Sequence, residues 1–200
     1  MALWPGHEFV CGLPGSGKTH HAVFLARQHR GPLLVIDPQD DPGLPWPRAD
    51  ASNTWGQIWA AAQHGGVRYV PSMDDERAHR ELRLITQRLL QPHSRELLLV
   101  VDEAHIYAPE GKPAGPLHQL ARRGRRFGAR LLLISQRPAD LSKGLVLLCS
   151  RHTIFTSFEG PYLQRFGIPA DDLRQRLATV EYGYCTWDMA TLQGPFRDPA

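Results

Sequence analysis

The sequence predicts an α/β fold in which a mostly parallel central sheet is covered by helices on both faces. Three segments, PLLVID, ELLLVVDE and ARLLLIS, contain nearly continuous apolar runs, which are typical of strands buried on both faces. Segments with helical character separate these runs along the chain. Because consecutive parallel strands need long crossover connections, this alternation favours a parallel sheet.

The first half of the chain supplies strands and helices in alternation. A helix that begins at Thr19 is expected to end before the Gly31-Pro32 pair, and its residues His20 and His21 are expected to be solvated. The segment over residues 38–47 contains four prolines and is expected to be an irregular loop. The other predicted elements are a strand over residues 7–12, a helix over 19–29, a strand over 32–37, a helix over 54–64 and a strand over 67–70.

The second half begins with the clearest helix, over residues 72–90. Its apolar positions recur at spacings of three and four residues, and Ser72 followed by Asp75 resembles a capping box. Gly128 is expected to end the next helix. The remaining predicted elements are a strand over 96–103, a helix over 117–127, a strand over 129–135, a strand nearer the sheet edge over 151–158, helical pieces over 161–177 broken at 167–169, and a terminal strand or hairpin over 182–200.

Length and composition predict a single globular domain over residues 1–200. Of the 200 residues, 42% are hydrophobic and 22% are charged, so the chain can bury a core and is not expected to be disordered. The longest apolar runs have five residues, so no membrane span is expected, and the N-terminus does not resemble a signal peptide. The three cysteines are widely spaced, which favours a reduced, cytoplasmic chain in which Cys11 and Cys149 are buried.

Basic charge is concentrated in one stretch of the chain. The net charge is only +3, yet residues 111–158 hold nine basic residues and one acidic residue. Of the 23 basic residues only three are lysine, and arginine is the side chain suited to bidentate phosphate contacts and to charge pairs at interfaces. The stretch is therefore a candidate surface for a polyanion or for a neighbouring subunit.

Residues 12–19, GLPGSGKT, fit the phosphate-loop pattern G-x-x-x-x-G-K-[ST] in full, and they lie between a predicted strand and a predicted helix. Glycines let the backbone aim successive N–H groups at phosphate oxygens, and the start of the helix adds its positive end. We expect the Lys18 ammonium to reach the β- and γ-phosphates of ATP and the Thr19 hydroxyl to ligate Mg²⁺. The predicted nucleotide-binding residues are Gly12, Pro14, Gly15, Ser16, Gly17, Lys18 and Thr19.

Polar side chains follow the two later apolar strands. Asp102 and Glu103 end the second of these strands, as in a Walker B element, so we expect Asp102 to hold Mg²⁺ through water and Glu103 to orient the attacking water. Gln136 follows the third apolar strand, which we expect to lie beside the strands of the phosphate loop and of Asp102. Its amide would then emerge near the γ-phosphate, where it can hydrogen-bond the water or the phosphate.

Two further strings give the chain a resemblance to a known family. Residues 121–128, ARRGRRFG, contain G-R-x-x-G, and residues 135–138 read SQRP after an apolar strand. Together with the preceding Asp-Glu pair, these strings resemble the HerA–FtsK superfamily of DNA-pumping ATPases. The resemblance implies a P-loop NTPase fold of the RecA/FtsK type. It covers roughly residues 8–158, the expected motor core, and leaves C-terminal helices and a hairpin over 159–200.

The resemblance implies roles for individual residues and a partner. Lys18, Glu103 and Gln136 match the Walker A lysine, the Walker B glutamate and the sensor glutamine. Superfamily members act as homo-oligomeric rings, usually hexamers, in which an arginine from a neighbour completes the ATP site. Arg125 and Arg151 are the two candidates for that arginine. Double-stranded DNA is expected to pass through the ring and to be contacted at its phosphates, with Lys112 in the loop over 107–116 and Lys143 in the loop over 140–144 as candidate contacts.

Within the superfamily, the short chain most resembles the genome-packaging ATPases of tailless icosahedral viruses with an internal membrane. This resemblance implies an ATP-hydrolysing subunit that pumps double-stranded DNA, placed in the host cytoplasm or on the virion. A capsid or membrane vertex protein is then a docking partner, with no direct membrane span.

Three alternatives stay open. One is a HerA-like DNA translocase of a cellular or plasmid system. Another is a small P-loop kinase, although Glu103 with Gln136 favours water over a substrate hydroxyl as the nucleophile. The third is a phage morphogenesis NTPase that resembles the zonula-occludens-toxin-like proteins.

Overall fold

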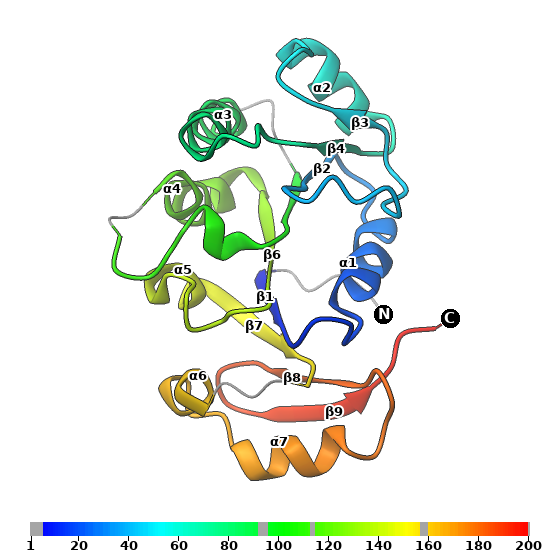
Figure 1. Cartoon of the computed structure of the whole chain (residues 1–200), viewed down its shortest axis with the longest axis vertical. Coiled ribbons are helices and arrows are strands. Elements are labelled where there is room, and N and C mark those ends of the chain that lie inside the picture. Colours follow the sequence, from blue (N-terminus) through cyan, green and yellow to red (C-terminus); the bar gives the residue numbers. More distant parts are fainter. Residues whose placement is uncertain (1–5, 92–95, 113–114, 157–159, 200) are drawn as a thin grey trace.

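The structure, a computed structural model, describes residues 6–91, 96–112, 115–156 and 160–199, and within them a single nine-stranded sheet. The order of strands across the sheet is β3-β4-β2-β5-β6-β1-β7-β8-β9 (Figure 1). The strands are β1 (His7–Cys11), β2 (Leu33–Ile36), β3 (Arg48–Ala49), β4 (Val67–Tyr69), β5 (Leu98–Val101), β6 (Arg130–Ser135), β7 (Cys149–Ile154), β8 (Tyr184–Trp187) and β9 (Leu192–Phe196). From β3 to β7 in this order the strands run parallel, and β8 and β9 add an antiparallel hairpin. The predicted α/β fold class is confirmed.

The register at the centre of the sheet brings three strand ends together. β6 lies between β5 and β1, as predicted for the strand that precedes Gln136. Val101 at the end of β5 is opposite Leu133, and Cys11 at the end of β1 is opposite Ser135. The connections that follow β1, β5 and β6 therefore leave the same edge of the sheet, where ligands of parallel sheets bind.

Both edges of the sheet differ from the predictions. β7 was expected near an edge, but it pairs with β1 on one side and β8 on the other, because the C-terminal hairpin covers it. The opposite edge is β3, a two-residue strand that has no periodic pattern to predict it. Residues 157 and 158 of the predicted strand, and residues 113 and 114 of the predicted loop over 107–116, lie outside the described residues.

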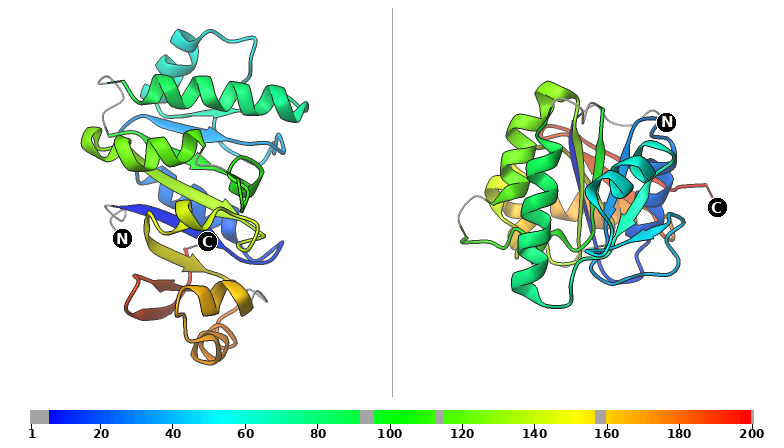
Figure 2. Two further views of the ribbon diagram at one scale, coloured as in Figure 1. Left: turned by 90° about the vertical axis from the view of Figure 1, so that its left-hand side faces the viewer. Right: turned by 90° about the horizontal axis from the view of Figure 1, so that it is seen from above.

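The helices cover the two faces of the sheet unevenly (Figure 2). Leu34 and Ile36 of β2 belong to the larger core, which includes residues of α2 to α7, whereas Leu33 and Val35 belong to the smaller core under α1. This two-sided burial explains why β2 and β5 are apolar throughout. The helices are α1 (Lys18–Arg27), α2 (Trp55–Gln63), α3 (Asp75–Leu89), α4 (Pro116–Arg123), α5 (Lys143–Val146), α6 (Gly160–Arg165) and α7 (Ala170–Leu177), with short 3-10 helices η1 (Ala104–Ile106) and η2 (Gly124–Phe127).

The start of α3 and the end of the helix predicted over 117–127 can be compared with the sequence predictions. The N-cap of α3 is Asp74, whose side chain accepts a hydrogen bond from the Arg77 backbone N–H at 2.8 Å, and not Ser72 as predicted. The helix predicted over 117–127 is α4 followed by η2, and Gly128 ends it with a φ of 76°, as expected for a glycine terminator.

The structure also shows where the cysteines lie and what kinds of helices the chain forms. Cys11 and Cys149 are buried, as predicted. Across the ranges that the structure describes, no helix has both the length and the apolar composition to cross a membrane.

His152 of β7 is fully buried and makes the fold sensitive to acid. Burial lowers the pKa of His152 to about 4, whereas an unfolded chain binds a proton on histidine near pH 6.5. Between these pH values the unfolded state holds more protons, so the free energy of unfolding falls by about 3 kcal/mol as the pH falls from 6.5 to 4. We expect His152→Phe, which suits the neighbouring rings of Phe9 and Phe166, to make that decline shallower in urea unfolding at several pH values.

The control for this prediction is His64→Gln, which changes an exposed histidine. It should keep the wild-type dependence of unfolding free energy on pH. A decline in His152→Phe as steep as in the wild type would contradict the role assigned to His152.

Candidate active site

The phosphate loop connects the end of β1 to the start of α1. Gly15 and Gly17 have φ angles of 71° and 103°, in the left-handed region that favours glycine, and Gly17 is the N-cap of α1. A Cβ atom at Gly12 would lie 2.6 Å from the Cβ atom of Phe155, so only glycine fits there. Toward β7 the loop is fixed by a hydrogen bond of 2.8 Å from the Leu13 backbone N–H to a carbonyl oxygen. The loop is thereby shaped to present its backbone, and the positive end of α1, to an anion.

Lys18 and Ser16 carry polar groups that could donate hydrogen bonds to a phosphate bound in this loop. Lys18 is buried, and its Nζ donates a hydrogen bond of 2.7 Å to the Leu13 carbonyl across the loop. Burial lowers the pKa of Lys18, while the charges of Glu103 and Asp102 act in the opposite direction. The Ser16 hydroxyl oxygen is buried without a hydrogen-bond partner among the described residues. A bound phosphate would give both groups an acceptor.

Glu103 is a buried acid in a strained backbone conformation. It is 6% exposed and has a φ of 44°, which is costly for a residue with a side chain. Its Oε1 atom accepts a hydrogen bond from the side-chain amide of Gln136. The Nδ1 atom of His105 lies 3.3 Å from Oε2. The structure therefore brings together two predicted site residues, Glu103 and Gln136, that are 33 positions apart in the chain.

Asp102 and Glu103 concentrate negative charge beside the phosphate loop. Burial and the Glu103 charge raise the pKa of Asp102 to about 6. A divalent cation would relieve this repulsion, and the Asp102 carboxylate and the exposed Thr19 hydroxyl are oxygen ligands of the kind that Mg²⁺ takes. In the described ranges no group of three or more His, Cys, Asp or Glu residues could hold a metal ion. The residues present fit Mg²⁺.

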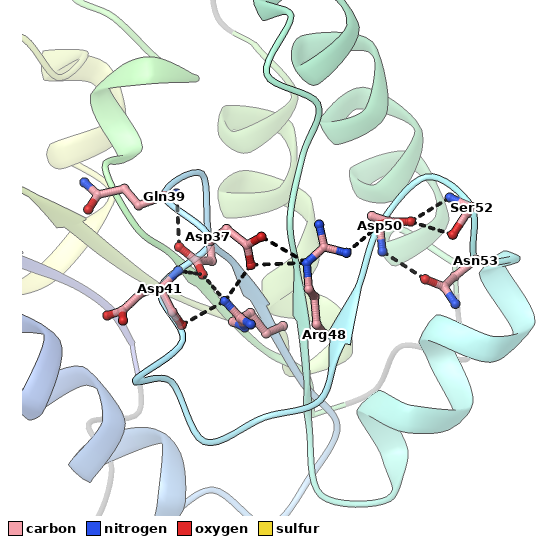
Figure 3. Close-up of polar contacts among 9 residues, drawn as sticks. Asp37, Gln39, Asp41, Arg48, Asp50, Ser52 and Asn53 are labelled. Carbon is pink, nitrogen blue, oxygen red and sulfur yellow. Dashed lines mark hydrogen bonds and ion pairs between the residues drawn. The ribbon is translucent and has the colours of Figure 1, made fainter.

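An acidic cluster at the end of β2 was not predicted (Figure 3). Asp37 is fully buried, and the Arg68 guanidinium of β4 lies 2.9 Å from its carboxylate and 2.9 Å from that of Asp40. Asp37 also accepts a hydrogen bond of 3.1 Å from the Gln39 backbone N–H, and the Gln39 amide lies 3.5 Å from Glu103 Oε1. The sequence did contain a signal for this cluster, since the apolar segment PLLVID ends in an acidic residue just as ELLLVVDE does.

His21 is buried and not solvated as predicted, whereas His20 is exposed. The His21 Nδ1 atom lies 2.8 Å from the Asp198 carboxylate, and Nε2 lies 3.8 Å from that of Glu8. Burial disfavours the charged ring, but hydrogen bonds and charge from Asp198 and Glu8 raise the pKa of His21 overall. Asp198 follows β9, and His21 lies in the first turn of α1, just after the phosphate loop. Their contact therefore joins the C-terminal segment to α1.

The structure places the two candidate arginines in different surroundings. Arg151 is 8% exposed in β7, and its Nε lies 3.9 Å from the Glu8 carboxylate. Arg125 is exposed in η2 and donates a hydrogen bond of 3.1 Å to a backbone carbonyl. It lines a hollow with His7 and Arg130, which begin β1 and β6, so it lies at the opposite edge of the sheet from the phosphate loop of its own chain.

Lys112 and Lys143 are both exposed. Lys112 lies on the loop that follows β5, whereas Lys143 is the first residue of α5 and not part of a loop over 140–144 as predicted, because a helix begins directly after Ser142. Pro109 and Leu141 form an isolated antiparallel bridge that ties the loops after β5 and β6 together. The backbone N–H of Lys143 donates a hydrogen bond of 2.6 Å to the Glu110 carboxylate. One loop follows the strand of Glu103 and the other follows the strand of Gln136, so both candidate DNA contacts stand on connections that leave the site.

Sequence relatives of this chain include archaeal helicases and a phage protein. The DNA double-strand break repair helicase HerA of Pyrococcus furiosus is 40% identical over 53 residues, which are 25% of this chain and 10% of that protein. The probable HerA helicase of Methanocaldococcus jannaschii is 30% identical over 132 residues, which are 58% of this chain and 26% of that protein. Protein P9 of Pseudoalteromonas phage PM2 is 24% identical over 146 residues, 72% of this chain and 65% of its own. The chain thus spans about a quarter or less of these HerA helicases, and no family model matches it.

A solved structure resembles the chain over nearly its whole length. It is the genome packaging NTPase B204 of Sulfolobus turreted icosahedral virus 2 in complex with ATP-γ-S, with a TM-score of 0.74. The likeness covers 95% of this chain and 96% of B204 at 17% sequence identity. At this identity the likeness concerns the fold, and it confirms the predicted P-loop NTPase class.

Proposed function

We propose that this chain, a P-loop NTPase of the HerA–FtsK type, hydrolyses ATP and uses the cycle to move double-stranded DNA. The observation that carries the proposal is the buried Glu103 carboxylate, held by Gln136 at the strand ends beside the Lys18 loop. Such an acid suits the activation of water. We further propose a homo-oligomeric ring, a hexamer, that serves as a viral genome-packaging motor in the host cytoplasm or on the virion. The likeness in fold to a packaging NTPase over 95% of the chain supports this role.

Each residue of the site has its own task in the proposed reaction. Lys18 turns from the Leu13 carbonyl to the β- and γ-phosphates. Glu103 orients and polarises the attacking water, while the Gln136 amide holds the water or the γ-phosphate and so responds to phosphate loss. Asp102 and Thr19 would hold Mg²⁺, which neutralises charge on the phosphates when bound.

We assign the arginine that a neighbour supplies to Arg125, because it is exposed, whereas Arg151 is paired inside its own subunit. Arg125→Ala is expected to lower ATP turnover of the assembled ring by about 10³-fold, the size of effect that a removed arginine finger has elsewhere. The measurement is phosphate release by the assembly. Mixed rings of variant and wild-type subunits should lose more activity than the variant fraction alone accounts for.

The matched control is Arg126→Ala, one position along the same turn. The Arg126 guanidinium lies 4.5 Å from the ring centre of the adjacent Phe127, within its own subunit. This variant should keep most of its turnover. Wild-type turnover in Arg125→Ala, or an equal loss in both variants, would contradict the assignment.

Contact of Lys112 and Lys143 with DNA phosphates predicts that their loss changes how DNA binding depends on salt. We expect Lys112→Glu with Lys143→Glu to weaken binding of duplex DNA and to make the fall of affinity with salt shallower, since two phosphate contacts per subunit are lost. Fluorescence anisotropy at several salt concentrations measures both effects. The control is Arg174→Gln, which removes an exposed charge from α7. Unchanged DNA affinity in the double variant would mean that other loops contact DNA.

The function as a whole is tested by ATP turnover with and without duplex DNA. We expect duplexes of any sequence to stimulate turnover, and the motor to displace a third strand from a triplex while it hydrolyses ATP. Transfer of the γ-phosphate to a small acceptor, with no effect of DNA, would favour the kinase alternative and overturn the proposal.

A second candidate function is a HerA-like translocase of a cellular or plasmid system. It is favoured by the 30% identity to the Methanocaldococcus jannaschii helicase over 132 residues. The two candidates differ in the docking partner, which for a packaging motor is a capsid or membrane vertex protein. Stable association with empty capsids would favour packaging, and a double-jelly-roll capsid gene beside the coding sequence would do the same.

A further inference from the structure

A hollow of about 290 Å³ lies beside the phosphate loop on the side away from Glu103. Its lining combines the phosphate loop, the first turn of α1, the end of β7 and the C-terminal segment, through Gly15, Gly17, His20, Phe155, Tyr182 and Arg197. In the sheet, β5 and β6 lie on one side of β1, and β7 and β8 lie on the other. The acid that activates water and the hollow therefore flank the phosphate loop from opposite sides.

This arrangement fixes the direction in which a nucleotide lies. The terminal phosphate must be the one nearest Glu103, so the phosphate chain runs away from β5 and β6. The sugar and base then leave the loop toward β7 and β8, where the hollow is found. Its volume is near the lower end for ligand pockets, about 300 Å³, which suits part of a ligand better than a whole nucleotide.

Tyr182 is the residue of this hollow that most needs an explanation. It is 57% exposed, which leaves a large aromatic ring facing solvent at the mouth of the hollow. Its φ of 53° is strained for a residue with a side chain, and such strain persists where the surroundings enforce it. An exposed aromatic ring beside the hollow is suited to stacking against a nucleobase.

The outer wall of the hollow is fixed by buried contacts. The Asp198 side chain is 6% exposed, lies 2.8 Å from His21 Nδ1 and accepts a hydrogen bond of 3.2 Å from the Tyr184 hydroxyl. These contacts hold the C-terminal segment against α1 and place its neighbour Arg197 at the hollow. The wall is therefore formed before any ligand binds, which reduces the cost of ordering it.

We propose that this hollow is the nucleoside subsite of the ATP site, with Tyr182 as the stacking surface for the base and Arg197 and Asp198 as the outer wall. The inference rests on the proposed function only in requiring a nucleoside triphosphate on the phosphate loop. Stacking is the main contact, so recognition depends on an aromatic side chain at position 182.

The test compares ATP with inorganic tripolyphosphate, which has no nucleoside. Both are titrated into the full chain by calorimetry, without DNA, with Glu103→Gln present to prevent turnover. We expect Tyr182→Ala to weaken ATP binding about tenfold and to leave tripolyphosphate binding as it was. Tyr182→Phe should bind ATP like the parent protein, and Asp198→Asn, which frees the wall, should weaken ATP selectively.

Three outcomes overturn the subsite. They are unchanged ATP affinity in Tyr182→Ala, an equal loss for ATP and tripolyphosphate, and a loss of the same size in Tyr182→Phe. Failure of the DNA function is separate, because it appears as turnover that DNA does not change, while the ATP preference still depends on Tyr182.

Discussion

Glu103→Gln is expected to abolish ATP turnover while nucleotide stays bound. The amide has the shape of the carboxylate and still offers an oxygen to Gln136, but it cannot take a proton from water. Loss of a positioned base typically slows a reaction by about 10² to 10⁴-fold. Single-turnover phosphate release and binding of ATP to the same sample measure the two properties separately.

The control for this change is Glu76→Gln, on the exposed surface of α3. It removes the same charge far from the phosphate loop and should retain turnover. Thermal unfolding of Glu103→Gln should stay close to that of the wild type. Turnover in Glu103→Gln above a tenth of the wild-type rate would place the water-activating group elsewhere.

Arg68→Met is expected to lower the free energy of unfolding by about 3–5 kcal/mol. Arg68 is the cation that faces the fully buried Asp37 carboxylate, at 2.9 Å. Its removal leaves the buried Asp37 charge without its cation, which costs more than the ion pair contributes when intact. Urea unfolding measures the change.

The same cluster supplies a matched control (Figure 3). Arg48 pairs with Asp40 and Asp50, but its side chain is 45% exposed and its ion pairs are screened by solvent, so Arg48→Met should lower the free energy of unfolding far less than Arg68→Met. Adding Asp37→Asn to Arg68→Met should restore part of the lost stability, because the uncompensated charge is gone. Equal costs for Arg68→Met and Arg48→Met would show that burial does not control this cluster.

The central sheet could be predicted because strands that are buried on both faces consist mostly of apolar residues. β2 and β5 are apolar throughout, β6 is apolar over residues 131–134, and helices separate the three strands along the chain. The edges could not be predicted in the same way. β3 has only two residues, and the position of β7 depends on a hairpin that begins at Tyr184, 30 positions after β7 ends at Ile154.

The residues of the candidate site fall into two groups, those that a local sequence pattern marks and those that only the folded sheet brings together. Lys18 and Thr19 lie in one contiguous motif, and Glu103 and Gln136 mark strand ends, so local sequence placed them near each other. Gln39 meets Glu103 across 64 positions, and His21 meets Asp198 across 177. Neither contact has a local pattern, since each depends on how the finished sheet brings distant connections to one edge.

The bridge between Pro109 and Leu141 has a mechanical consequence. It joins the connection that follows Glu103 to the connection that follows Gln136, and Lys143 lies two residues beyond it, at the start of α5. A displacement at either strand end would therefore move both connections together. In the proposed motor, the two lysines would then shift as one unit, whichever of the two side chains responds first to loss of the γ-phosphate.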